Sequence, residues 1–83
     1  MLASNKFYNF NSEDVLNCTS LPDLYEMKVN NLETITSIKI QMAEYGDDIK
    51  KVKALLHLEY LQEIINTQIE IIKYTKYEQN NSN

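Results

Sequence analysis

The sequence contains no arginine or tryptophan, and it has only one glycine, one proline, one cysteine and one histidine among 83 residues. A single glycine excludes the glycine-rich loops that cradle phosphate groups. A single cysteine excludes an internal disulfide, and one cysteine with one histidine cannot form a Cys/His zinc cluster. The sequence shows no pairing of a nucleophile with a base. We therefore predict a protein that is not an enzyme and that holds no metal and no cofactor.

The charge pattern argues against direct binding to nucleic acid. All eight cationic residues are lysines, and the formal net charge is −4 at pH 7. Arginine, the usual residue for bidentate contacts with phosphate and guanine, is missing. No run of about 20 apolar residues could span a membrane, and the first ten residues lack the apolar run of a signal peptide. We expect a cytoplasmic protein that binds neither nucleic acid nor a membrane.

Helical periodicity dominates the rest of the chain. From Leu21 to Tyr45 and from Asp48 to Tyr77, apolar residues recur at every third or fourth position, which is the spacing of one helix face. Gly46 separates the two segments, because glycine most easily adopts the left-handed conformation that follows a helix. A link this short predicts that the two long helices fold back as an antiparallel hairpin. The expected fold class is all-α.

The two ends of the chain are less regular. A cap at Asn11 or Ser12 predicts a short helix over residues 12–18. Residues 1–11 are expected to form an irregular arm whose aromatic side chains dock on an apolar surface, with a locally packed or frayed terminus as an equal alternative. The aromatic residues of this arm are Phe7, Tyr8 and Phe10. Residues 78–83 are polar and without periodicity, so we expect them to be disordered.

The second long helix has more apolar surface than one packing partner can cover. One arc of its circumference holds Ile49, Leu56, Tyr60, Ile64, Ile71 and Tyr74, and a second arc holds Ala54, Leu58, Leu61, Ile65, Ile69 and Ile72. Together they cover roughly 220°, whereas an ordinary surface helix needs about 100°. Either the helix is central, with neighbours on two sides, or it presents a groove to a foreign ligand or peptide.

A chain of this size has a thin stability margin, which favours oligomerisation into a helical bundle of at least two subunits. The predicted subunit interface consists of Leu58, Leu61, Ile65, Ile69 and Ile72, together with the aromatic residues of the arm, Phe7, Tyr8 and Phe10.

Two lysines interrupt the apolar face of the first long helix. Lys28 and Lys39 project close to the centre of this face, near Tyr25. One alternative is a salt bridge across the hairpin or across a subunit interface. The other is a pocket between protomers, in which Lys28, Lys39 and Tyr25 bind an anionic ligand such as a nucleotide. His57, between the two apolar arcs of the second helix, is expected to be hydrogen-bonded at a helix interface.

By elimination, the sequence favours a non-enzymatic interaction protein, a small regulator or inhibitor that binds a partner protein. Its six tyrosines agree with this, since tyrosine is enriched at protein interfaces. Two other classes stay open: an oligomeric pocket protein that sequesters a small anionic ligand, and a structural assembly subunit. Ten asparagines, nine isoleucines and no arginine indicate a gene rich in A and T. A phage or mobile-element origin, with the host cytoplasm as the location, is a hypothesis from composition.

Overall fold

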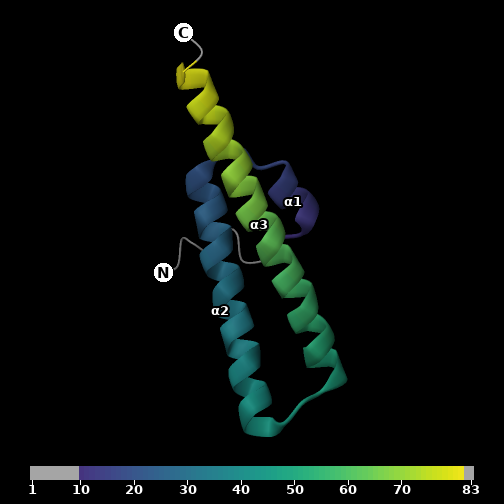
Figure 1. Cartoon of the computed structure of the whole chain (residues 1–83). Coiled ribbons are helices and arrows are strands. Elements are labelled where there is room, and N and C mark those ends of the chain that lie inside the picture. Colours follow the sequence, from purple (N-terminus) through teal and green to yellow (C-terminus); the bar gives the residue numbers. More distant parts are fainter. Residues whose placement is uncertain (1–9, 82–83) are drawn as a thin grey trace.

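The structure, a computed structural model, describes the backbone of residues 10–81 and the side chains of residues 10–76. Over this range the chain forms three helices and no strand: α1 (Ser12–Leu16), α2 (Leu21–Tyr45) and α3 (Ile49–Asn81). Helices α2 and α3 lie side by side and antiparallel, and α1 packs against α3 (Figure 1). The predicted all-α class, with two long helices packed on each other, is confirmed. Association of subunits stays a prediction.

Helix α1 is a single capped turn. Asn11 and Asp14 form a capping box, in which the Asp14 backbone N–H donates to Asn11 Oδ1 at 2.9 Å and the Asn11 backbone N–H donates to Asp14 Oδ2 at 3.0 Å. The helix ends at Leu16, two residues before the predicted end at residue 18. A helix of five residues is too short to be stable alone, so its position depends on what it contacts.

The ends of α2 follow the sequence signals. Ser20 Oγ accepts a hydrogen bond from the Asp23 backbone N–H at 3.4 Å, and Pro22 occupies the first turn, where its missing N–H costs nothing. At the other end, the Gly46 N–H donates to the Met42 carbonyl at 2.9 Å. Gly46 has φ 89° and ψ 167°, a conformation that is almost confined to glycine. The turn therefore depends on this residue.

Helix α3 continues beyond the predicted end. It begins at Ile49, where Asp48 Oδ1 accepts the Lys50 backbone N–H at 3.0 Å, and it reaches Asn81 rather than ending at Tyr77. Residues 78–81, which we expected to be disordered, thus belong to the helix. No glycine or proline follows Gly46 to stop it, and a polar sequence without such residues is compatible with a continuing helix.

The core lies where the three helices meet. It consists of one buried cluster, which contains Val15, Leu24, Met27, Leu61, Ile65 and Ile69. Phe10, Cys18 and Ile72 are half-buried and pack against this cluster. Because α1 folds back onto α3, both α1 and α2 pack against the second arc of α3.

This arrangement corrects the predicted subunit interface. Leu61, Ile65 and Ile69 are 2%, 0% and 4% exposed, so they are occupied within the chain. Leu58 and Ile72 are half-buried. Phe10 packs on the core of its own chain, while Phe7 and Tyr8 lie outside the described residues. On α3, the surface left for other molecules is most of the first arc.

Buried amides join the helices at two places. The Asn31 Nδ2 group donates to the Leu58 carbonyl at 2.9 Å and to Gln62 Oε1 at 2.8 Å, across the interface between α2 and α3. The Gln68 Nε2 group donates to the carbonyls of Leu16 at 3.4 Å and of Cys18 at 2.9 Å, which ties the end of α1 to α3. These bonds fix how the helices slide and rotate against one another.

Candidate interaction surfaces

The outer side of α2 carries an exposed apolar stripe. Its members recur every third or fourth residue, and we call them the α2 stripe: Tyr25, Val29, Leu32, Thr36, Ile40 and Ala43. Val29 and Ile40 are 53% and 54% exposed. At 100° per residue, the stripe centre lies roughly 140° around the helix from the buried side of α2. The stripe therefore points away from α3.

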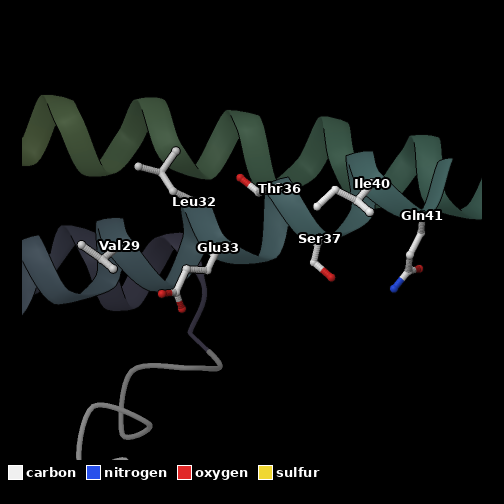
Figure 2. Close-up of a pocket in the computed structure, with 7 residues that line it drawn as sticks. All are labelled: Val29, Leu32, Glu33, Thr36, Ser37, Ile40 and Gln41. Carbon is white, nitrogen blue, oxygen red and sulfur yellow. The ribbon is translucent and has the colours of Figure 1, made fainter. Parts of the chain in front are cut away.

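A depression of about 490 Å³ lies over this stripe. All of its lining residues come from α2: Val29, Leu32, Glu33, Thr36, Ser37, Ile40 and Gln41. Figure 2 shows Leu32, Thr36 and Ile40 on one side of the helix and Glu33, Ser37 and Gln41 on the other. With one helix as its only wall, this is an open face rather than an enclosed cavity. Such a face suits the side chains of another helix better than a small molecule, which needs burial on most sides.

Helix α3 carries a second exposed stripe, formed by much of its first arc. The α3 stripe consists of Leu56, Tyr60, Ile64, Thr67, Ile71 and Tyr74. Leu56 and Tyr60 are 61% and 60% exposed, and Tyr74 is 64% exposed, while Ile64 is half-buried. The stripe centre lies roughly 150° around α3 from the buried residues Leu61, Ile65 and Ile69.

Helix α1 extends this second surface. Leu16 is 59% exposed, and it borders a depression of about 240 Å³ together with Tyr60, Glu63, Ile64 and Thr67. The two stripes thus lie on opposite edges of the hairpin, one on α2 and the other on α3 with α1 beside it.

The lysines singled out in the sequence do not converge on one site. Lys39 Nζ lies 3.7 Å from Glu59 Oε2, so it makes a salt bridge across the hairpin. Lys28 is half-buried and lies 11 residues away, about 17 Å along the same helix. Tyr25 is 43% exposed and belongs to the α2 stripe. For Lys39, the salt-bridge alternative is the one observed.

His57 and Cys18 offer no visible chemistry. His57 is exposed and does not lie at a helix interface of the described chain, because α1 covers α3 only further along. The half-buried Cys18 thiol donates to the Ser20 carbonyl at 3.6 Å. Among the described residues, no group of three or more His, Cys, Asp or Glu side chains is placed to hold a metal ion. Over the same range, no helix is long and apolar enough to cross a membrane.

The apolar periodicity did not predict the buried amides. Asn30, Asn31 and Gln68 are 8%, 3% and 7% exposed. A signal was present for the first pair, since Asn30 and Asn31 interrupt the apolar spacing between Met27 and Ile35, where a purely apolar core would place a hydrophobic residue. For Gln68 the sequence does not indicate the partners, because the carbonyls of Leu16 and Cys18 lie at the end of α1 and just after it, 52 and 50 residues earlier.

Comparisons with protein-family models, with curated proteins and with solved structures gave no match for this chain. The two stripes are therefore the features from which a function can be argued.

Proposed function

We propose that this chain is a non-enzymatic interaction protein that binds other proteins through its α2 and α3 stripes. One observation supports this most directly. Among the described residues, eleven large hydrophobic or aromatic side chains are exposed, while seven hydrophobic side chains form the core. Scattered exposed hydrophobics are ordinary, but contiguous apolar patches mark interaction sites. Here most of the exposed side chains fall into two helical stripes.

The stripe geometry suits contact with another helix. Fully burying an aliphatic side chain contributes about 1.5–3 kcal/mol. Because the stripe residues are already about half covered, five of them contribute about 4–8 kcal/mol. Association itself costs about 4–15 kcal/mol. One stripe alone therefore supports a weak or transient contact, and a tight complex requires charged partners at its rim or both stripes together.

A regulator or inhibitor that occupies the surface of a partner protein is the leading form of this proposal. A structural assembly subunit is the second, and the placement of the stripes on opposite edges favours it, since each copy could contact two neighbours. The pocket protein for an anionic ligand has less support, because Lys28 and Lys39 are about 17 Å apart on α2 and Lys39 is paired with Glu59.

The test is capture of a partner by the tagged chain from cells of its source, followed by quantitative mass spectrometry. Ile40→Glu and Ile71→Glu each place a charge in one stripe, and Asn66→Glu adds the same charge at an exposed position outside both stripes. We expect one protein in near-stoichiometric amount, lost at least tenfold with one stripe variant and retained with Asn66→Glu. Helical circular dichroism verifies that each variant is folded. Absence of any stoichiometric partner, or equal capture by all variants, would contradict the proposal.

A further inference from the structure

The α2 stripe has opposite charges along its two edges. Lys28 and Lys39 directly precede the stripe residues Val29 and Ile40. On the other edge, three glutamates directly follow stripe residues: Glu26 after Tyr25, Glu33 after Leu32 and Glu44 after Ala43. Consecutive helix residues are 100° apart, so the residues that directly precede stripe residues line one edge of the stripe and those that directly follow them line the other. We call these the preceding edge, which is basic, and the following edge, which is acidic.

The α3 stripe carries its charges in the opposite order, with the acidic residues on the preceding edge. Glu59, Glu63 and Glu70 directly precede the stripe residues Tyr60, Ile64 and Ile71, whereas His57 directly follows Leu56. Lys73 lies on the acidic edge and is paired with Glu70 at 3.7 Å. The preceding edge of this stripe is therefore predominantly acidic.

The relative direction of two helices decides which edges meet. When two helices face each other in antiparallel orientation, the preceding edge of one lies beside the preceding edge of the other. An antiparallel contact between an α2 stripe and an α3 stripe thus brings Lys28 and Lys39 to the glutamates of α3. If the α2 stripe packs antiparallel on the α2 stripe of a second copy, lysines face lysines. If the α3 stripe packs antiparallel on another α3 stripe, glutamates face glutamates. Like charges brought together in this way disfavour such pairings.

The lengths of the two stripes also agree. Each covers 18 residue steps, from Tyr25 to Ala43 and from Leu56 to Tyr74, or about 27 Å. In an antiparallel alignment Tyr25 meets Tyr74, and Ala43 meets Leu56. The small residues Thr36 and Thr67 then lie beside the larger residues Ile64 and Leu32. Lys28 comes next to Glu70, and Lys39, which already pairs with Glu59 of its own chain at 3.7 Å, comes next to Glu63.

We infer that the occupant of the α2 stripe is the α3 stripe of a second copy of this chain, packed antiparallel. The inference rests on the proposed interaction role of the stripes and names one partner for them. The contact joins two different surfaces, and the two stripes point away from each other. Each copy therefore accepts one neighbour at each edge, which gives a ring if the rotation closes and an open chain if it does not.

Light scattering during size-exclusion chromatography, from 5 to 500 µM protein, tests this assembly. We expect wild-type masses above that of a dimer, either rising with concentration or settling at one closed ring. Ile40→Glu blocks the α2 stripe and Ile71→Glu blocks the α3 stripe, so each variant alone should be monomeric. An equimolar mixture of the two should form a 1:1 dimer, because one intact stripe of each kind remains. Asn66→Glu should assemble at least as readily as the wild type, because Asn66 directly precedes Thr67 and so lies on the acidic edge that faces the lysines of α2.

A charge exchange provides a second measurement that leaves the apolar stripes intact. Lys28→Glu should weaken assembly at least tenfold, and mixing it with Glu70→Lys should restore part of the loss. Several results would overturn the inference: a monomeric wild type at 500 µM, dimers of either single stripe variant alone, or a charge exchange without effect. If the wild type is monomeric and yet loses a captured partner upon Ile40→Glu, only this inference fails and the proposed function stands. If neither assembly nor capture responds to the stripe variants, both fail.

Discussion

Replacing Gln68 by methionine should weaken the attachment of α1 to the hairpin. Gln68 is 7% exposed, and its amide is the donor to the carbonyls of Leu16 and Cys18. Methionine has nearly the same length and fills similar space, but it cannot donate. The change therefore isolates the hydrogen bonds from the packing of the side chain.

The expected loss follows from the two distances. A hydrogen bond contributes about 0.5–1.5 kcal/mol net, and a buried acceptor left without a donor costs about 1–3 kcal/mol. The bond to Cys18 at 2.9 Å is well formed, while the bond to Leu16 at 3.4 Å is long and weaker. The two together contribute about 1–2 kcal/mol. Burial of Val15, which is fully buried, contributes about 1.5–3 kcal/mol. The hydrogen bonds of Gln68 thus supply a substantial share of the free energy that holds the five-residue helix α1 in place.

Urea unfolding followed by circular dichroism, with hydrogen exchange measured on peptides covering residues 11–20, checks this expectation. A domain of this length is stable by about 4–12 kcal/mol, so a loss of about 1–2 kcal/mol is readily measured. The exposed Asn66→Met serves as control and should stay within about 0.5 kcal/mol of the wild type. If Gln68→Met unfolds at the same urea concentration and residues 11–20 exchange at the wild-type rate, the two hydrogen bonds add nothing to stability.

Two further substitutions test the other joints of the hairpin. Asn31→Leu should destabilise the chain by about 1–3 kcal/mol in urea unfolding, because it leaves Gln62 without its only described partner. The double change with Gln62→Leu should recover most of this loss. A double variant less stable than the single one would contradict this expectation. Gly46→Ala should cost about 1–3 kcal/mol through backbone strain alone, since no atom lies within 4 Å of an added Cβ; thermal unfolding measures this, and an unchanged midpoint would show that the turn relaxes freely.

The helices could be predicted because their signals are local. Ser20, Pro22 and Gly46 mark the limits of α2 within a few residues of sequence, and the 3–4 spacing of apolar residues identifies both long helices. The choice between the two arcs of α3 is not local. It depends on where α1 docks, and α1 docks through Val15 and Gln68, which are far apart in sequence. This is why Leu61, Ile65 and Ile69 were assigned to a subunit interface although they belong to the core.

The dependence on where α1 docks also limits how much of the candidate site could be predicted from the sequence. The sequence alone shows that α3 carries two apolar arcs and that a short chain cannot cover both. Which arc remains exposed follows from where both α2 and α1 pack on α3. The outer stripe of α2 was not predicted, since the periodicity indicates a single apolar face for this helix, whereas Tyr25 and Leu32 are 43% and 42% exposed on its outer side.

The third helix of this fold is much shorter than the two hairpin helices, so it cannot cover their full length. This difference in length links the fold to the proposed assembly. Helix α1 is five residues long, so it covers only the part of α3 near Gln68. The rest of the α3 stripe and the outer side of α2 have no neighbour within the described chain. A third full-length helix would cover one of these edges, and an α2 helix from a second copy has the length, direction and edge charges to take that place on α3. In that view the second copy supplies the third long helix that the described part of this chain does not contain.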